Sequence, residues 1–491
     1  MRSSSVKQTR RTFLRAALAG ATTLAATRGF GDIRPKRTKR PNVLFLFSDD
    51  QRADTIHALG NAHVRTPNLD RLVQSGTAFT NAYIMGGSCP AVCAPSRAML
   101  LTGRSLWRLD RQGMWNYEIS EKNKTMPEVF REAGYATFQT GKWHQREGSF
   151  KRGFTTGKNV WFGGTGDHFR ILPCDYAPPE TDLVPEKTRR SRQKAMGGGP
   201  RGAHSSEAFA NGMISFLTER PKDRPFFAYV AFFAPHDQRI APKEYHAMYP
   251  PEDLPLPGNF MPQHPFDNGE MKIRDEKLER WPRTKSAIQK HLSDYYAIIT
   301  HLDAQIGRIL DALKESGEYE NTIIVFSSDN GLAIGSHGLM GKQSVYEHSV
   351  RVPLIVSGPG VPRNERRSTF CFLLDIFPTL CDVIGLPVPK TVEGKSFAAA
   401  FRNPRTRARD ALYFSYMNVQ RAVREGRYKL IEYHVKGKRT TQLFDLETDP
   451  LEMNNLASDD NHKEALARLR ERLVQLRDEY ADKTNVFWRG C

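Results

Sequence analysis

The pentapeptide Cys-Ala-Pro-Ser-Arg at residues 93–97 is the part of the chain that points most clearly to chemistry. Its proline suits the first turn of a helix, where proline removes no backbone hydrogen bond, and Gly103 suits a left-handed helix end. Cys93 would then lie just before a helix N-terminus, where free N–H groups favour anions. A cysteine there could act on an anionic substrate, and it could also be a simple reactive thiol.

Polar clusters follow four short apolar runs, at residues 42–47, 135–139, 226–233 and 322–326. Nearly continuous apolar runs are typical of parallel strands that are covered on both faces. Because ligands bind at the carboxyl ends of strands in open α/β sheets, we predict that the clusters share one edge. Their members are Asp49 and Asp50, Lys142 and His144, His236 and Asp237, and Asp329 and Asn330.

Each cluster taken alone has a simpler interpretation. Asp49 and Asp50 could form a solvated turn, and Asn330 before a glycine is typical of a hairpin turn. His236 could be a loop histidine without a task, and Lys142-Trp143-His144 could be a surface loop. The functional interpretation therefore depends on all four endings occurring together with Cys93, and it requires the strands to be parallel.

A metal site is predicted from the carboxylates and the amide. Asp49, Asp50, Asp329 and Asn330 offer only oxygen ligands. Such a set suits a hard cation, calcium rather than zinc, and magnesium fits the same ligands as the second choice.

The motif at residues 93–97, together with Leu-Thr-Gly-Arg at residues 101–104, resembles the maturation signature of the formylglycine-dependent sulfatases of the alkaline phosphatase superfamily. The resemblance extends over about residues 42–456. It implies that a maturation enzyme oxidises Cys93 to formylglycine, whose hydrate attacks the sulfur of a sulfate ester. It also implies a calcium ion, held by Asp49, Asp50, Cys93, Asp329 and Asn330.

The resemblance also implies catalytic roles for five further residues. Arg97 would hold the hydrated formylglycine, and Lys142 would lie beside it. His144 would take a proton from the second diol oxygen and so expel sulfate. His236 would be the general acid at the leaving-group oxygen, and Lys342 would contact the sulfate.

One departure from the family lies just after His236. Many relatives carry a proline two positions later, whereas this chain has Gln238. We assign the neighbouring Asp237 and Arg239 to substrate binding, with pairing between the two as the alternative. His337, in the same loop as Lys342, is interpreted as loop-shaping rather than catalytic.

Helical patterns at residues 67–75, 126–133 and 292–316 alternate with the apolar runs. The alternation predicts an α/β fold, with helices that sandwich a large mixed, mostly parallel sheet, and we assign residues 42–387 to this catalytic domain. A smaller antiparallel-sheet domain is predicted for residues 388–491, with the charged amphipathic helix at 464–478 packed on it. Its expected strands are 411–414, 420–424, 427–433 and 440–444.

The N-terminus predicts export. Residues 1–29 resemble a twin-arginine signal peptide and residues 30–41 form a basic linker, which implies the twin-arginine translocase as a partner and a periplasmic or secreted protein. Residues 1–40 contain eleven Lys or Arg and one acid, so they account for most of the net charge of +18. This distribution argues against a nucleic-acid partner. No apolar stretch reaches the ~20 residues of a membrane span.

The chain contains six cysteines. Cys89 is expected to be structural, and no bridge is expected between Cys371 and Cys381, which flank a predicted helix. Twin-arginine cargo folds before export, so disulfides need not hold this protein together.

The predicted activity is hydrolysis of sulfate esters, most consistent with sulfated carbohydrate, while aryl and choline sulfates remain open. A phosphonate or phosphate ester hydrolase of the same superfamily and a non-catalytic polyanion-binding protein are the alternatives. Residues 163–204 lack periodicity and are either a lid over an anionic glycan or a flexible insertion.

Overall fold

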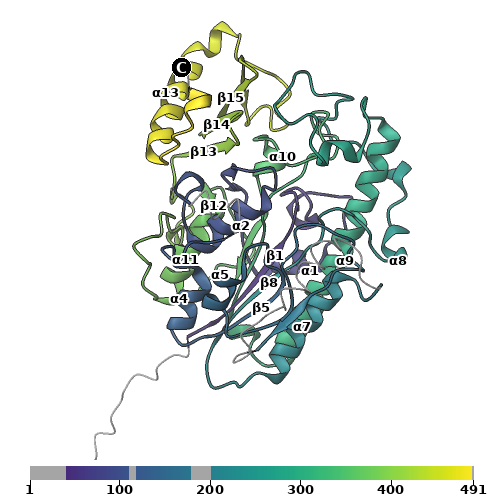
Figure 1. The fold of residues 1–491 in the computed structure, drawn as a ribbon, viewed down its shortest axis with the longest axis vertical. Helices are drawn as coiled ribbons and strands as arrows, with labels where there is room; N and C mark the ends of the chain where they lie inside the picture. Colours follow the sequence, from purple (N-terminus) through teal and green to yellow (C-terminus); the bar gives the residue numbers. More distant parts are fainter. Residues whose placement is uncertain (1–39, 110–117, 178–200, 489–491) are drawn as a thin grey trace, which may run out of the picture. The chain divides into compact units, whose positions relative to one another are not determined.

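The computed structural model describes residues 40–109, 118–177 and 201–488. The predicted signal peptide, nearly all of the basic linker, residues 178–200 and Cys491 lie outside the described residues. The described chain forms an α/β layer and a smaller antiparallel sheet, as predicted (Figure 1). None of its helices combines the length and the apolar character that a membrane crossing requires.

A nine-stranded sheet with the order β11-β2-β10-β9-β1-β8-β5-β6-β7 forms the larger layer. The four predicted strands are neighbours at its centre and run parallel, as the shared-edge hypothesis requires. They are β9 (Thr322–Ser328), β1 (Asn42–Ser48), β8 (Phe226–Ala231) and β5 (Ala136–Lys142). The outer strands are β10 (Leu354–Ser357), β2 (Gly76–Phe79), β11 (Glu365–Arg367), β6 (Thr156–Trp161) and β7 (Cys174–Tyr176). Of these, β10 and β7 run antiparallel to their neighbours.

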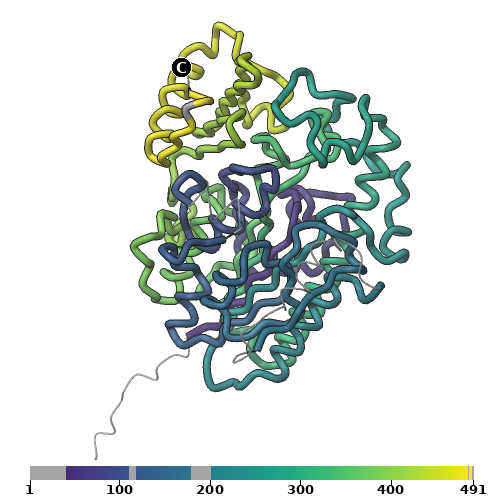
Figure 2. The backbone as a smooth tube through the Cα atoms, in the orientation of Figure 1, coloured from purple at the N-terminus to yellow at the C-terminus, as the bar shows by residue number. Residues whose placement is uncertain are grey.

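Strand β1 shows why a continuous apolar run predicts a central strand of this sheet. All seven of its residues are buried. Val43 and Phe45 pack in one hydrophobic core, whereas Leu44 and Leu46 pack in another on the opposite face. Alternate side chains of a strand point to opposite faces, so a sheet covered on both sides needs apolar residues at every position. In Figure 2, later parts of the chain lie on both sides of the purple segment that contains β1.

Helices cover both faces of this sheet. One face is covered by α1 (Pro67–Ser75), α7 (Ser205–Glu219) and α9 (Lys285–Glu315). The other face is covered by α2 (Cys93–Thr102), α4 (Met126–Glu132), α5 (Glu147–Gly153) and α11 (Ile376–Ile384).

Helix α9 begins seven residues before the predicted start. The Thr284 side chain accepts a hydrogen bond from the N–H of Ala287 and caps the helix. Ile288 and Leu292 are the buried residues of its first turns, and mostly polar residues separate them. Apolar periodicity therefore missed this end of the helix.

The second sheet has the order β16-β15-β14-β13-β4. Helix α13 (Lys463–Glu479) lies beside it and buries Leu469, Leu473 and Leu476, as predicted (Figure 1). The fifth strand was not predicted: β4 is a two-residue strand just upstream of α2, and it pairs with β13. The strands are β13 (Ala411–Tyr416), β14 (Gln420–Glu425), β15 (Tyr428–Val435), β16 (Lys438–Asp445) and β4 (Gly86–Gly87).

Short elements complete the described chain. A two-stranded sheet joins β3 (Ala82–Tyr83) to β12 (Cys371–Phe372). The short helices are α8 (Lys243–His246), α10 (Glu347–Val350), α12 (Ala399–Arg402) and α14 (Asn485–Trp488).

Candidate active site

The ends of β1 and β9 bring the four predicted oxygen ligands together. The backbone N–H of Asp50 donates to Oδ1 of Asp329 over 3.1 Å. The amide of Asn330 donates to Oδ1 of Asp50 over 2.7 Å. Since β1 and β9 run parallel side by side, their carboxyl ends place these side chains at one edge.

Arg97 ties this edge to helix α2. Its side chain is completely buried, and it donates to Oδ2 of Asp329 at 2.9 Å and to Oδ2 of Asp49 at 3.0 Å. A third hydrogen bond, of 3.0 Å, reaches the carbonyl oxygen of Lys142 at the end of β5. One guanidinium therefore links the ends of three strands to the helix that begins at Cys93.

Cys93 lies in the first turn of α2, within reach of two cations. Its Sγ is 3.9 Å from Nζ of Lys142 and 3.9 Å from Nζ of Lys342. Burial raises the pKa of the Cys93 thiol to about 12, although the two lysines act in the opposite direction. The unmodified side chain is therefore a neutral thiol, which argues against a simple reactive cysteine.

The lysines also pair with the carboxylates. Lys142 forms an ion pair with Asp49, and Nζ of Lys342 lies 2.6 Å from Oδ1 of Asp50. Burial favours the neutral form of Asp50, but Lys342 and His236 outweigh it and lower the pKa of this carboxyl. The formal charges of the cluster balance, with three carboxylates against three cations. The members are Asp49, Asp50, Asp329, Arg97, Lys142 and Lys342.

The donor set fits a hard cation. Oδ1 of Asp49 and Oδ1 of Asn330 are buried and have no hydrogen-bond partner among the described residues. Ligand atoms of Asp49, Cys93 and Asp329 lie within 4.8 Å of one another, and so do those of Asp49, Asp50 and His236. Spare buried oxygens in such a group are what an oxygen-ligated ion requires.

Two histidines, His144 and His236, flank the cluster. Burial, and then the charges of Lys142 and Arg97, lower the pKa of His144 well below its usual value, so its imidazole is neutral near pH 7. His236 donates from Nδ1 to the carbonyl oxygen of Asp237 over 2.7 Å. Its Nε2 is turned toward the edge and lies 3.8 Å from Oδ2 of Asp50.

A pair of buried histidines holds the loop that carries His236. Nε2 of His168 donates to the carbonyl oxygen of His236 over 3.0 Å, and Nε2 of His204 donates to that of Ile240 over 3.2 Å. The two rings stack with centroids 4.8 Å apart. The described ends of the 163–204 segment therefore pack against the loop that carries His236, and nothing in the sequence pattern predicted this contact.

The two predicted substrate residues have different partners. Asp237 binds Nη2 of Arg274 through both oxygens, at 2.6 and 2.7 Å. Nη1 of Arg239 lies 3.4 Å from Nδ1 of His291. Arg274, 37 residues away in the chain, takes the carboxylate of Asp237, and Arg239 acts on this carboxylate only through its charge. Against the opposite effect of burial, this charge helps His236 and Arg274 to lower the pKa of Asp237.

The loop of Lys342 is shaped by Glu276, which the sequence did not reveal, and by His337. Glu276 accepts hydrogen bonds from the N–H groups of Met340 and Gly341, just before Lys342. His337 stacks on Tyr346 at 4.0 Å and donates to the carbonyl oxygen of Glu452 over 3.1 Å. These contacts are structural, as expected for a loop-shaping histidine.

Comparison with known proteins gives two matches to family models. The model described as Sulfatase matches residues 41–386, and the model described as N-sulphoglucosamine sulphohydrolase, C-terminal, matches residues 335–479. An arylsulfatase of Clostridium perfringens is 31% identical over 469 residues, which cover 89% of this chain and 94% of that protein.

A more distant relative and a solved structure also match over most of the chain. An N-acetylglucosamine-6-O-sulfatase of Bacteroides thetaiotaomicron is 26% identical, with 93% of this chain and 90% of that protein covered. A solved structure, described as in complex with its substrate D-glucosamine-2-N,6-O-disulfate, superposes with a TM-score of 0.73 at 23% identity. The superposition covers 91% of this chain and 99% of that one, and it shows that the fold is shared.

Proposed function

The chain belongs to the sulfatase family, and we propose that it hydrolyses the sulfate esters of carbohydrates with a formylglycine made from Cys93 and a bound calcium ion. The observation that carries the proposal is the position of Cys93. Its Sγ faces two lysine ammonium groups, and it lies beside carboxylates with a spare oxygen.

The two added groups supply the parts of the chemistry that side chains lack. Hydrated formylglycine supplies an oxygen nucleophile, and calcium supplies a Lewis acid for the sulfate. Asp49, Asp50, Asp329 and Asn330 would hold the ion, with magnesium as the second choice. Arg97 keeps two of these carboxylates and the start of α2 in fixed positions.

The charge balance explains why an anion would bind in a buried site. The three carboxylates and three cations cancel without a metal. A divalent cation gives the cluster a net charge of +2, which favours a sulfate monoester. Lys142 and Lys342, whose Nζ atoms both lie 3.9 Å from Sγ of Cys93, would bind the sulfate oxygens.

Proton transfer is assigned to the two histidines. His144 is neutral near pH 7, as a group that accepts a proton from the side chain at position 93 must be. His236 donates its Nδ1–H to the Asp237 carbonyl, which fixes the ring, and in the imidazolium form its Nε2 carries the proton that would pass to the leaving alkoxide. The clamp of His168 and His204 fixes the backbone on which this orientation depends.

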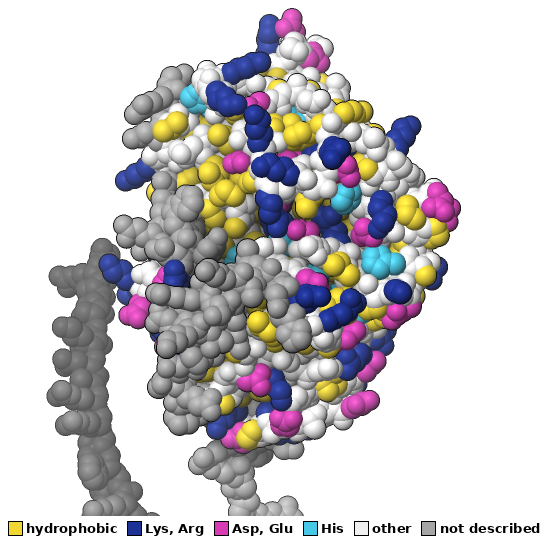
Figure 3. Space-filling model, turned by 45° about the vertical axis from the view of Figure 1, so that its right-hand side comes forward, with side chains coloured by type: hydrophobic (Ala, Val, Ile, Leu, Met, Phe, Trp, Pro, Cys, Tyr) yellow, Lys and Arg dark blue, Asp and Glu magenta, His cyan; other side chains and the backbone are white. Residues whose placement is uncertain are grey.

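The proposed substrate and location rest on a relative, on the surface charge and on the N-terminal sequence. One relative is an N-acetylglucosamine-6-O-sulfatase, which favours a sulfated sugar. Lys and Arg side chains gather in the upper half and centre of one face, which suits an anionic glycan (Figure 3). The twin-arginine sequence at residues 9–15 supports export through the twin-arginine translocase to the periplasm or beyond.

Side-by-side turnover tests this proposal. The chain is produced together with a formylglycine-generating enzyme and assayed on sulfated saccharides, an aryl sulfate, and the matching phosphate and phosphonate esters. We expect sulfate esters to be hydrolysed and the Cys93→Ala protein to be inactive. Preference for the phosphorus esters would replace the proposal with the related hydrolase, and saccharide binding without any turnover would replace it with a polyanion-binding protein.

A further inference from the structure

Arg274 joins three loops that meet at the candidate active site. It lies directly before the short 3₁₀ helix η4 (Asp275–Leu278), and its side chain is 47% exposed. Its Nη2 donates to both oxygens of Asp237, at 2.6 and 2.7 Å, and its Nη1 donates to Oγ1 of Thr165 over 3.1 Å. Its Nε donates to Oδ1 of Asp275 over 2.9 Å. A planar guanidinium has donors that point in fixed directions, so one side chain can hold three partners.

The first contact leads to His236. Oδ1 of Asp237 lies 3.2 Å from Nδ1 of His236, and the same nitrogen donates to the carbonyl oxygen of Asp237 over 2.7 Å. Both of these neighbours of Nδ1 therefore belong to the residue whose carboxylate Arg274 holds. Because the ring is fixed through Nδ1, its Nε2 stays turned toward Oδ2 of Asp50, 3.8 Å away. Arg274 thus controls the direction of the proposed general acid.

The second contact leads to Lys142 and His144. Thr165 follows Gly164, and the carbonyl oxygen of Gly164 accepts a hydrogen bond of 2.8 Å from Nζ of Lys142. Gly164 also lies against His144, because a Cβ on this glycine would lie 2.7 Å from Nε2 of the imidazole. By holding Thr165, Arg274 keeps this stretch of backbone against both of the proposed catalytic side chains.

The third contact leads to Lys342. Oδ2 of Asp275 accepts a hydrogen bond of 2.7 Å from Nε2 of Gln343, while its Oδ1 binds Arg274. Oε1 of Gln343 in turn accepts a hydrogen bond of 3.0 Å from the backbone N–H of Lys342. Asp275 and Gln343 are both buried, so water competes little for these bonds. The chain of contacts therefore fixes the backbone from which Lys342 reaches position 93.

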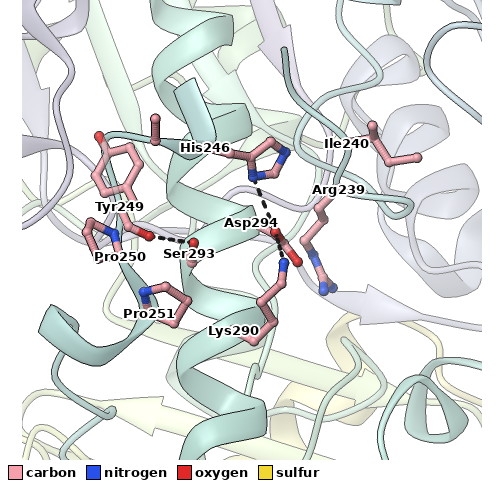
Figure 4. Close-up of a pocket in the computed structure, with 10 residues that line it drawn as sticks. Arg239, Ile240, His246, Tyr249, Pro250, Pro251, Lys290, Ser293 and Asp294 are labelled. Carbon is pink, nitrogen blue, oxygen red and sulfur yellow. Dashed lines mark hydrogen bonds and ion pairs between the residues drawn. The ribbon is translucent and has the colours of Figure 1, made fainter. Parts of the chain in front are cut away.

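Arg239, two residues after Asp237, has a different environment. Its Nη1 lies 3.4 Å from Nδ1 of His291, and its guanidinium lies 5.8 Å from the centroid of the Tyr295 ring. Both of these residues belong to α9, and Figure 4 shows Arg239 beside this helix, where it lines a pocket of about 520 Å³. Arg239 therefore packs on a helix of the scaffold, whereas Arg274 spans three loops.

We propose that Arg274 is a positioning residue for the reaction of this site. Through its three contacts it fixes the ring of His236 and the surroundings of Lys142 and Lys342, and it acts on the reaction only through these residues. Asp237 then serves to hold His236 rather than to bind the sugar. The inference rests on the proposed function, because it assigns a task to a residue that surrounds the proposed catalytic groups.

Turnover of the Arg274→Ala enzyme, matured like the unsubstituted one, is the first test. Misplacement of catalytic groups is costly, so we expect kcat to fall by about 10- to 100-fold. The loss should be larger for a saccharide sulfate than for 4-nitrophenyl sulfate, because nitrophenolate leaves without the help of an acid and so does not need His236. Arg280→Ala is the matched control, since Arg280 is exposed and lies just beyond η4. Thermal unfolding shows whether each variant is folded.

Rescue of the lost side chain separates positioning from a general effect on the fold. Guanidinium chloride, added to Arg274→Ala below denaturing concentrations, should raise kcat severalfold, because the free ion can donate in the same directions as the missing group. Sodium chloride at the same concentration should not, and neither salt should raise the kcat of Arg280→Ala. Arg274→Lys should stay impaired, since one ammonium group cannot replace a planar fork of donors.

Hydrogen exchange of the unmatured chain tests the three contacts without turnover. In Arg274→Ala, the backbone amides of residues 164–166, 236–238 and 340–343 should exchange faster than in the unsubstituted chain. Arg280→Ala should leave all three segments unchanged. Mass spectrometry of peptides that cover these segments measures the difference.

Three results would overturn this role. One is that exchange in the three segments is the same with and without Arg274, and another is that kcat of Arg274→Ala stays within about twofold of the unsubstituted value. The third is a loss of kcat that is equal for both esters and that guanidinium does not restore, which would mean that Arg274 supports the fold alone. Failure of the proposed function is a separate result, since the unsubstituted matured enzyme would then not hydrolyse sulfate esters, while the exchange rates would still report on the contacts.

Discussion

The Arg97–Asp49 pair of the candidate active site and the Arg421–Asp482 pair of the C-terminal region are built from the same groups. Both pairs are completely buried. Asp482 accepts hydrogen bonds at both oxygens, from Arg421, from the hydroxyl of Tyr413 and from the N–H of Thr484. Asp49 receives Arg97 and Lys142 at Oδ2, and its Oδ1 has no partner among the described residues.

This difference separates a pair that stabilises the fold from one that is prepared for a ligand. A buried ion pair is tolerated when further hydrogen bonds satisfy its remaining atoms, as at Asp482. An unsatisfied oxygen in the same environment carries a free-energy cost that a bound cation removes. The two regions therefore respond differently to the same isosteric substitution.

The largest expected effect is that of Asp49→Asn on turnover. The substitution removes one carboxylate charge from the proposed calcium site, so we expect kcat/KM of the matured enzyme to fall by about 10³-fold or more. Steady-state assays on the preferred sulfate ester measure this loss. A variant that keeps more than about a tenth of the activity would show that Asp49 is not a ligand of a catalytic ion.

Asp482→Asn should lower the stability of the protein and leave its turnover nearly unchanged. It leaves Arg421 buried without its carboxylate, so we expect the free energy of unfolding to fall by about 3–5 kcal/mol. Urea unfolding followed by tryptophan fluorescence measures this change, and kcat per folded molecule should stay within about twofold. A large loss of kcat in well-folded Asp482→Asn protein would remove the distinction between the two regions.

Calcium should stabilise the folded protein through Asp49 and independently of Asp482. At a free concentration about 100 times Kd, a ligand that binds only the folded state adds about 2.7 kcal/mol to the free energy of unfolding. We expect this increase, seen as a higher Tm, in the unsubstituted chain and in Asp482→Asn. It should be absent in Asp49→Asn and after addition of a chelator.

Magnesium provides the comparison for the choice of ion. The oxygen ligands suit calcium better, so magnesium should raise Tm less at the same concentration. An equal or larger shift with magnesium would reverse the order of the two ions.

The sequence predicted the catalytic edge because its signals are local. Apolar residues at every position of 42–47 and 322–326 indicate strands covered on both faces, and the polar residues that follow must lie at strand ends. Asp49 and Asp329 could therefore be placed together without knowledge of the 279 residues between them. The parallel order of four strands was the one tertiary assumption, and it is correct.

The parts that the sequence did not reveal depend on contacts between distant loops. No pattern joins Asp237 to Arg274, or His168 to the carbonyl oxygen of His236, because such pairs have neither a period nor a fixed spacing. Strand β4 could not be predicted either, because its two glycines have no strand propensity and pair with β13 only in the folded chain.

The pH dependence of the free energy of unfolding tests the His168–His204 clamp, and its expected effect is the smallest of those considered. Burial lowers the pKa of His168 to about 3, whereas in the unfolded chain it returns to about 6.5. The unfolded state therefore binds the proton more tightly, so this stabilisation is complete above pH 6.5 and is lost as the pH falls toward 3. Between pH 6.5 and 5.5 the loss from His168 is about 1 kcal/mol.

The variant His168→Gln isolates this contribution, because a glutamine amide can still donate to the carbonyl oxygen of His236 but does not titrate. Urea unfolding at pH 6.5 and 5.5 should show that the unsubstituted chain loses about 1 kcal/mol more than the variant over this interval. His337→Gln is the matched control near the C-terminal sheet, since burial also lowers the pKa of His337, to about 4. Kinetics at pH 6.5 then use the alanine variants, which remove the hydrogen bonds: His168→Ala should lower kcat and His337→Ala should not, because only His168 holds the backbone of the proposed general acid. Equal effects of both variants on kcat would mean that the clamp contributes stability alone.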